Sequence, residues 1–239
     1  KVDDTHFLFI GNFDHYRPDL SGLQGEELEQ AKQALEEEKD YEVFDELPFW
    51  SNGKGVVNKR RRRLYLFDVT SGECQLLSPA YMNVSSFRYR AQDDLLLYYG
   101  HDYEWMDDQK DDMYLLHLNH PEQQPEIQQL SIQLKHRYGV DAADFMGDQV
   151  IIAASTGTNE NPTFFTADPQ TGKLNKLCDL DPSMGSSVGS DCRHGGGTTA
   201  KTTDTAWYYT ETRGFNSCIV RLDQGGKETQ ITPQVNGSV

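Results

Sequence analysis

Two glycine-rich motifs within residues 185–197 have the residue types of a serine hydrolase site. Residues 185–189, GSSVG, match G-x-S-x-G, in which the serine is the nucleophile, and residues 194–197 match the oxyanion-type H-G-G-G. A nucleophile elbow needs an apolar strand before it and a helix after it, but Pro182 interrupts the first and glycines spoil the second. The H-G-G-G also follows the serine here, whereas in hydrolases it lies on an earlier loop. We therefore expect a connecting segment and no catalytic role for Ser187.

Residues 59–63, KRRRR, form a basic run in a chain with 22 basic and 38 acidic residues and a net charge of -16. Nucleic-acid binding needs a basic surface, so this balance argues against a nucleic-acid partner. The run leads into a strand at Leu64, so alternate side chains should face opposite sides. Neutralisation of the acidic segment before it is the simplest interpretation. The alternative is a substrate contact, because a guanidinium binds a carboxylate in a forked geometry, and Arg60 and Arg62 are the candidates.

Metal and cofactor sites need clustered ligands, and no such cluster stands out. Residues 101–112 carry six acidic side chains but lack the D-x-D-x-D-G order of a calcium loop, so we interpret them as a solvated loop. The histidines at 117, 120 and 136 show no metal-type spacing, and the four cysteines contain no C-x-x-C pair. We expect each cysteine to be a small buried residue in a reducing, cytoplasmic compartment, with no metal and no cofactor.

Length and composition restrict the class of protein. The chain has 239 residues, of which 36% are hydrophobic and 11% aromatic, so it is not of the disordered type. It has no run of about 18 apolar residues and no basic-then-apolar start, so neither a membrane span nor a signal peptide is predicted. Because it starts at Lys1 within a predicted strand, we expect a piece of a longer protein.

The chain repeats itself about every 50 residues. Four segments share an apolar or aromatic strand, a turn opened by Asp or Asn, and a short second strand: residues 64–79, 113–131, 163–179 and 218–233. The residues that open the turns follow one another at intervals of 51, 49 and 55: Asp68, Asn119, Asp168 and Asp223. Asp and Asn side chains accept bonds from the nearby backbone and glycine adopts positive φ, so these turns reverse the chain.

Further strands are predicted before each of these hairpins. Apolar runs occur at residues 7–11, 95–100, 149–155 and 205–211, and weaker ones at 84–90, 138–145 and 196–201. Four antiparallel strands in about 50 residues are typical of a β-propeller blade, whereas a β-sandwich would not need the same turn at a constant interval. We predict an all-β partial propeller of about four to five blades. Its blades would be residues 1–79, 80–131, 132–180 and 181–233, with the next starting at 234–239.

The first blade carries a predicted insertion at residues 12–63. Residues 25–39 have Leu28, Ala31 and Leu35 at helical spacing, so they predict an amphipathic helix. Residues 43–50, VFDELPFW, are apolar and aromatic. They form either a flap packed on the propeller or an edge that lines a binding site, and Trp50 is a candidate contact there.

Residues 47–73, LPFWSNGKGVVNKRRRRLYLFDVTSGE, resemble the N-terminal propeller of prolyl-oligopeptidase-family serine peptidases. The acylaminoacyl-peptidase and dipeptidyl-aminopeptidase branch is the most similar. Residues 188–197, VGSDCRHGGG, resemble an inter-blade segment of the same branch. The resemblance implies a propeller that covers an α/β-hydrolase domain, which carries the catalytic Ser, Asp and His. No part of that domain is recognisable here, so no catalytic residue is assigned.

The resemblance implies a size filter that admits short peptides and excludes folded proteins. The predicted partners are an α/β-hydrolase domain of the same polypeptide and short or N-acylated peptides, with no nucleic acid and no membrane. Asp191 and Arg193 are either structural hydrogen-bonders or further channel contacts, beside Arg60, Arg62 and Trp50. The alternatives are a free-standing propeller that serves as a binding scaffold, or the propeller of a tricorn-like protease.

Overall fold

The computed structural model describes residues 1–17, 19–118, 126–129, 138–157, 160–179, 181, 183–185 and 200–233. The chain divides into two compact units. Unit 1 comprises residues 1–85 and 101–109, and unit 2 comprises residues 86–100 and 110–239. Within the described ranges, no helix has the length and apolar character needed to cross a membrane.

Unit 1 is built on a three-stranded antiparallel sheet in the order β1-β4-β5. The strands are β1 (His6–Asp14), β4 (Arg60–Asp68) and β5 (Cys74–Leu76). The pairing of β1 with β4 runs from His6 opposite Asp68 to Asp14 opposite Arg60. The two strands therefore extend into the predicted insertion from both sides, and the segment between them is residues 15–59 rather than 12–63.

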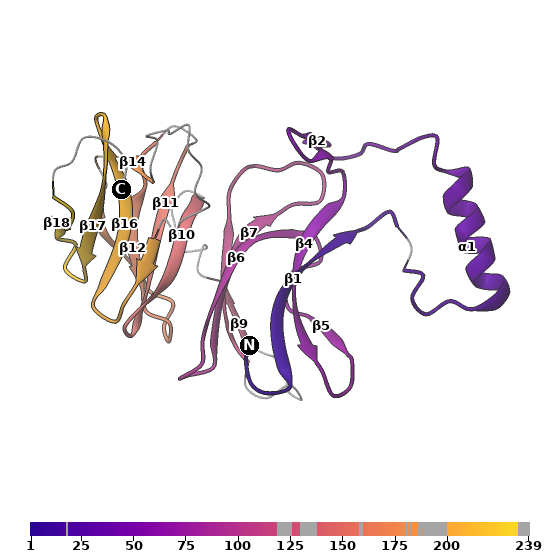
Figure 1. Ribbon diagram of the computed structural model, residues 1–239, viewed down its shortest axis with the longest axis horizontal. Helices are drawn as coiled ribbons and strands as arrows, with labels where there is room; N and C mark the ends of the chain where they lie inside the picture. Colours follow the sequence, from indigo (N-terminus) through magenta and orange to yellow (C-terminus); the bar gives the residue numbers. More distant parts are fainter. Residues whose placement is uncertain are drawn as a thin grey trace. The chain divides into compact units, whose positions relative to one another are not determined.

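The insertion holds one helix and a two-stranded ribbon. Helix α1 (Gly25–Glu37) ends two residues before the predicted end, and two extended arms connect it to the strands (Figure 1). It has no fully buried residue, and its half-buried face carries Leu28, Ala31 and Leu35, as the spacing predicted. Strands β2 (Trp50–Ser51) and β3 (Gly55–Val56) form the ribbon just before β4.

Three more antiparallel sheets follow, each from one consecutive stretch of chain. The first is β6 (Met82–Arg90), β7 (Leu95–Asp102), β8 (Asp112–His117) and β9 (Glu126–Gln129). The second is β10 (Gly139–Met146), β11 (Gln149–Ser155), β12 (Thr163–Ala167) and β13 (Leu174–Asp179). In the third, β14 (Ser183–Met184) and β15 (Ala200–Thr202) both pair with β16 (Ala206–Arg213), which continues to β17 (Asn216–Asp223) and β18 (Glu228–Gln230). The predicted all-β class with one helix is thus confirmed.

Three of the four repeated turns have the predicted chemistry. The Asp68 carboxylate accepts the backbone N–H of Thr70 at 2.8 Å, and Asp168 accepts two backbone N–H groups at 2.8 and 3.0 Å. Asp223 likewise accepts two, both at 3.0 Å. These bonds stabilise the charged form and lower the pKa of each of the three carboxyl groups. A glycine at positive φ closes each turn, and the fourth turn residue, Asn119, lies outside the described residues.

Unit 2 is held together by apolar faces of successive sheets. Leu95, Leu97 and Leu115 belong to one buried cluster with Ile152. A second cluster joins β11 and β12 to β16 and β17, where the fully buried Phe164 ring meets Trp207 edge-on at 5.3 Å. Burial of such large side chains is the main favourable contribution to folding.

Candidate functional site

The basic run lies on β4 and just before it, and its side chains alternate as predicted. Arg61 and Arg63 are buried, with 1% and 8% of their surface exposed, whereas Arg60 and Arg62 are exposed. The two inward arginines lie among polar groups of unit 1. The run is therefore mainly a structural element, and only its outward members are open to a ligand.

Arg61 uses all five of its N–H groups inside the protein. Its Nη1 and Nη2 donate to the two carboxylate oxygens of Glu46 at 3.1 and 2.6 Å, and both side chains are fully buried. Nε donates to the carbonyl of Tyr81 at 2.7 Å, Nη2 to that of Tyr103 at 2.9 Å, and Nη1 to that of Arg60 at 3.1 Å. A guanidinium with five bonds has none left for a substrate, so Arg61 holds the insertion in place.

Neighbouring residues fix the same returning segment. Asn58 accepts the backbone N–H groups of Asp45 and Glu46 at 3.2 Å each and donates to the carbonyl of Val43 at 2.8 Å. The N–H of Lys59 donates to Glu46 Oε1 at 2.9 Å, and its ammonium lies 3.9 Å from the centre of the Trp105 ring. The ion pair of Arg61 with Glu46 and the 3.9 Å distance between Lys59 Nζ and Asp45 agree with local neutralisation, the simplest of the sequence interpretations.

A second buried cluster surrounds Arg63. Its guanidinium lies 3.6 Å from the centre of the Phe13 ring, and its Nε donates to the carbonyl of Ala80 at 2.9 Å. His15 Nε2 lies 3.1 Å from Arg63 Nη2, and the imidazole stacks on Tyr81 at 4.4 Å. Burial, together with the positive charge of Arg63, lowers the pKa of His15, so the neutral imidazole is favoured.

The structure places three of the five predicted contact residues, all in unit 1. Arg60 donates to Asp14 at 3.2 Å and to the carbonyl of Val56 at 2.8 Å, while Arg62 donates to the carbonyl of Ser85 at 3.4 Å. Trp50 lies on β2 with 54% of its surface exposed. The other two candidates, Asp191 and Arg193, lie outside the described residues, as does Ser187.

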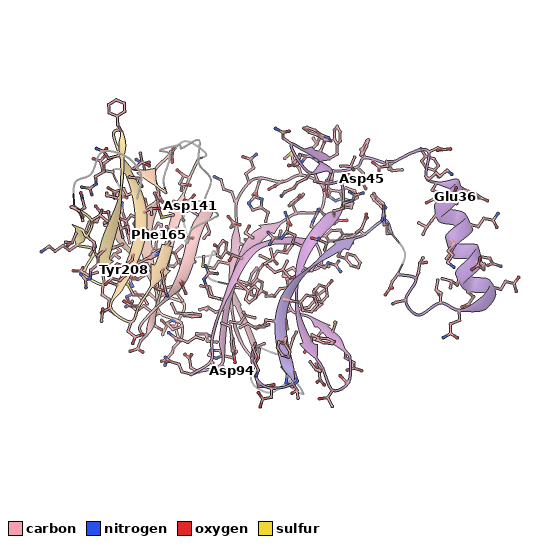
Figure 2. All side chains as sticks on the ribbon, in the orientation of Figure 1. Glu36, Asp45, Asp94, Asp141, Phe165 and Tyr208 are labelled. Carbon is pink, nitrogen blue, oxygen red and sulfur yellow. The ribbon has the colours of Figure 1, made fainter. Side chains whose placement is uncertain are left out.

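Arg60 lines a cavity of about 500 Å³ between the insertion and the ends of β1 and β4. Figure 2 marks Asp45, where the insertion returns to the strands, and Glu36, near the end of α1. The cavity walls carry three aromatic rings, four aliphatic or amide side chains and six charged groups. They are Asp14, Tyr16, Arg17, Leu35, Glu38, Lys39, Tyr41, Glu42, Val43, Phe44, Val56, Asn58 and Arg60. A volume of this size is in the range that holds a side chain or a small ligand.

Exposed apolar side chains gather on the same insertion and on the loop after β7. We call them the aromatic strip: Tyr41, Val43, Phe44, Leu47, Phe49, Trp50, Trp105 and Met106. Backbone bonds connect its two parts, because Leu47 N–H donates to the carbonyl of Trp105 and Asp107 N–H donates to the carbonyl of Leu47, both at 2.8 Å. The Phe44 and Phe49 rings stack at 4.7 Å. Most side chains of residues 43–50 are thus exposed, whereas a packed flap would bury them.

Two predictions from the sequence, the solvated acidic loop and the buried cysteines, are wrong in part. The acidic stretch 101–112 is not simply a solvated loop, because Asp107 bonds His101 at 2.9 Å and the buried Asp111 accepts the N–H of Val140 at 2.7 Å. Cys74 is exposed rather than buried, because it lies on β5 at the edge of its sheet. Among the described residues, no group of three or more His, Cys, Asp or Glu could hold a metal ion.

Solved structures share this fold, although no protein-family model and no curated protein matches the sequence. Acylaminoacyl peptidase from Pyrococcus horikoshii superposes with a TM-score of 0.57 at 14% identity, over 96% of this chain and 30% of that chain. An acylaminoacyl peptidase in complex with Z-Gly-Gly-Phe-chloromethyl ketone gives 0.57 at 13% identity, with the same coverage. Puromycin hydrolase gives 0.52 at 13% identity, over 73% of this chain and 27% of that chain.

These superpositions show that the chain has the fold of one part of these peptidases. It spans 30% or less of their length. The fold agrees with the partial propeller that the sequence resemblance implies. At these identities the likeness concerns the fold alone, so no residue of a peptidase site is transferred to this chain.

Proposed function

We propose that the chain is the non-catalytic propeller of a serine peptidase of the prolyl-oligopeptidase family, in the acylaminoacyl-peptidase or dipeptidyl-aminopeptidase branch. The observation that carries the proposal is the superposition of 96% of the chain on part of an acylaminoacyl peptidase. The resemblance of residues 47–73 points independently to the same family. In this proposal the propeller admits and orients short or N-acylated peptides for an α/β-hydrolase domain of the same polypeptide.

The proposal treats each sheet as one blade. The blades would be residues 1–79, 80–131, 132–180 and 181–233, with residues 234–239 starting the next. This division is supported by the fact that each sheet takes its strands from one consecutive stretch. The repeated Asp turns join the last two strands of three of these sheets, which is the regularity that stacking of similar units requires.

The chain's own residues would bind and orient substrate, not break bonds. Arg60 and Arg62 present exposed guanidinium groups, which suit a peptide carboxylate or carbonyl, and Trp50 presents an exposed indole to an apolar side chain. Asp191 and Arg193 remain candidate contacts of the same kind. Rigid sheets suit a size filter, because a channel of fixed width passes an extended peptide and excludes a folded protein.

A free-standing binding scaffold is the second candidate. The aromatic strip favours it, because a large exposed apolar patch marks an interaction site in a soluble protein. A scaffold needs no hydrolase domain, so the two candidates differ in what the complete gene product can do.

The test compares this chain with the complete product of its gene. Both are treated with a fluorophosphonate probe, which labels active serine hydrolases, and are assayed on acetyl-alanine p-nitroanilide. We expect the complete product to be labelled and active, and the 239-residue chain to be neither. If the probe does not label the complete product, the free-standing binding scaffold becomes the better proposal. Activity of this chain that Ser187→Ala abolishes would overturn our exclusion of that serine.

The filter is tested on the complete product with peptides of increasing length. N-acetylated peptides of about 5 residues should be cleaved, and the same sequence placed in a loop of a folded protein should not. Equal rates on both substrates would contradict a size filter while leaving the peptidase assignment intact.

A further inference from the structure

The segment that carries the aromatic strip is anchored by several hydrogen bonds and one buried ion pair of unit 1. The buried Arg61–Glu46 pair, the three bonds of Asn58 and the backbone bonds of Leu47 all anchor the segment that presents it. The backbone that presents the apolar side chains is therefore anchored, although the side chains themselves are exposed. A preorganised patch loses little conformational entropy when it binds a partner, and exposed tryptophans are frequent centres of such interfaces.

The neighbouring cavity shares Tyr41, Val43 and Phe44 with the strip. Each of its three cationic side chains lies near a carboxylate: Arg60 and Arg17 lie 3.2 and 3.7 Å from the same carboxylate oxygen of Asp14. Lys39 pairs with Glu36.

Two carboxylates that line the cavity, Glu38 and Glu42, have no hydrogen bond or ion pair with any residue in the described part of the chain. Helix α1 ends beside them with no basic residue in its last turn, and its carbonyl end adds negative partial charge. Aromatic rings beside free carboxylates are suited to a cationic head group.

We propose that the cavity and the aromatic strip together bind a segment of a partner protein in which a lysine or arginine lies between apolar residues. The cationic head enters the cavity toward Glu38 and Glu42, and the apolar neighbours cover Phe44, Phe49 and Trp50. This proposal does not depend on the peptidase assignment, since it concerns a surface of unit 1 only.

Charge favours such a partner over a second copy of this chain. The chain has a net charge of -16, and the exposed residues beside the strip include Asp40, Glu42 and Glu104. Two identical acidic surfaces repel each other, whereas a basic segment is attracted and steered toward this one. The attraction should weaken with added salt, because these carboxylates are exposed.

The probe is a fluorescein-labelled dodecapeptide in which lysines alternate with leucine and phenylalanine, titrated with the 239-residue chain by fluorescence polarisation. We expect Trp50→Ala to raise Kd about tenfold or more, as loss of an interface tryptophan does. Glu42→Gln should raise Kd about threefold, in the range of one exposed charge pair. The affinity should also fall between 50 and 500 mM NaCl.

Matched control variants distinguish binding at this site from non-specific binding of the peptide. Phe215→Ala removes an aromatic ring that is 94% exposed on another surface, and Glu27→Gln removes an exposed carboxylate from the far end of α1. Both should leave Kd within twofold of the unaltered chain. A twin peptide with glutamate in place of every lysine should not bind.

The proposal is overturned if Trp50→Ala and Glu42→Gln behave like these controls, or if the glutamate twin binds equally well. It is also overturned if sedimentation shows a dimer that Trp50→Ala dissociates, since a second copy would then cover the strip. A benzophenone-bearing version of the lysine peptide gives a readout that needs no variant. Crosslinks within residues 38–50 support the site, and crosslinks confined to other residues refute it.

Discussion

Replacing Glu46 by glutamine should destabilise unit 1 more than any change to the exposed part of the basic run. Glutamine keeps the size and shape of the side chain but removes the negative charge that faces the Arg61 guanidinium. Both side chains are fully buried, with bonds of 3.1 and 2.6 Å between them. The positive charge would then remain in the interior without a counter-charge, and water cannot reach it.

The expected loss is about 3–5 kcal/mol, the usual cost of removing one partner from a buried ion pair. This is a large part of the ~5–15 kcal/mol by which a domain is normally stable. For a unit of this size each kcal/mol corresponds to roughly 4–8 °C, so the melting temperature of unit 1 should fall by at least about 12 °C. Arg62→Met on the same strand removes only an exposed guanidinium with one 3.4 Å bond, so it should change stability by no more than about 0.5 kcal/mol.

Hydrogen exchange read by mass spectrometry is the suitable assay, because the two units need not unfold together. The amide of Lys59, which donates to Glu46 Oε1, and the amide of Glu46, which donates to Asn58, report on the site directly. In Glu46→Gln these amides should exchange at least about a hundredfold faster, while those of β11 and β12 stay unchanged. If Glu46→Gln and Arg62→Met change the exchange rates equally, the buried ion pair does not stabilise unit 1 as we expect.

Three other expectations follow from single sites. Burial and the charge of Arg63 lower the pKa of His15 in the folded protein. The contribution of His15 to the free energy of unfolding is therefore complete above the ordinary histidine pKa of about 6.5. It is lost as the pH falls below that value, because the unfolded state then binds the proton more readily. Urea midpoints between pH 8 and 5 should therefore fall less steeply for His15→Gln than for the unaltered chain. Asp168→Ala should lower the urea midpoint, because two backbone N–H groups lose their acceptor, and equal midpoints of variant and parent would contradict this. Phe164→Ala should cost about 3–5 kcal/mol, since it leaves a cavity beside Trp207, and a loss below about 1 kcal/mol would show that the core closes around it.

The sheets were predictable because their signals are local. The turn at Asp168 is specified by the acid that opens it and by a glycine four residues later, and both act on their own backbone. Strand β12 beside it is a short apolar run, and β13 pairs with it directly across the turn. The same holds at Asp68 and Asp223, so one local rule locates three of the hairpins.

The extent of the β1–β4 pairing was not predictable to the residue. It continues to Asp14 opposite Arg60 because the charged ends of the two strands can bond each other across the pair. Residues 12–14 contain only one apolar side chain, Phe13, and residues 60–63 contain none, so neither stretch shows where the strand pairing stops. The two segments lie 46 residues apart in the sequence, so their pairing can be recognised only in the three-dimensional structure.

The partner of Arg61 was hidden for a similar reason. The alternation of the basic run and its role in neutralisation followed from the sequence, but fifteen residues and the ribbon β2–β3 separate Arg61 from Glu46. The available signal was the pair of adjacent acids Asp45 and Glu46, followed directly by the apolar residues 47–50. Two of the remaining acceptors are the carbonyls of Tyr81 and Tyr103, which no side-chain pattern reveals.

A buried ion pair contributes little net stability compared with apolar residues of the same size, so the Arg61–Glu46 pair is better explained by the position that it imposes. The double variant Glu46→Leu with Arg61→Met separates the two roles. It removes both charges together, so the free energy of unfolding should be higher than in Glu46→Gln. It also removes every directional bond from Arg61, so the backbone bond from Leu47 N–H to Trp105 should open more often. We therefore expect a partly restored melting temperature with faster exchange at Leu47 than in the unaltered chain. Exchange at Leu47 that stays at the parent rate would show that packing alone holds the aromatic strip.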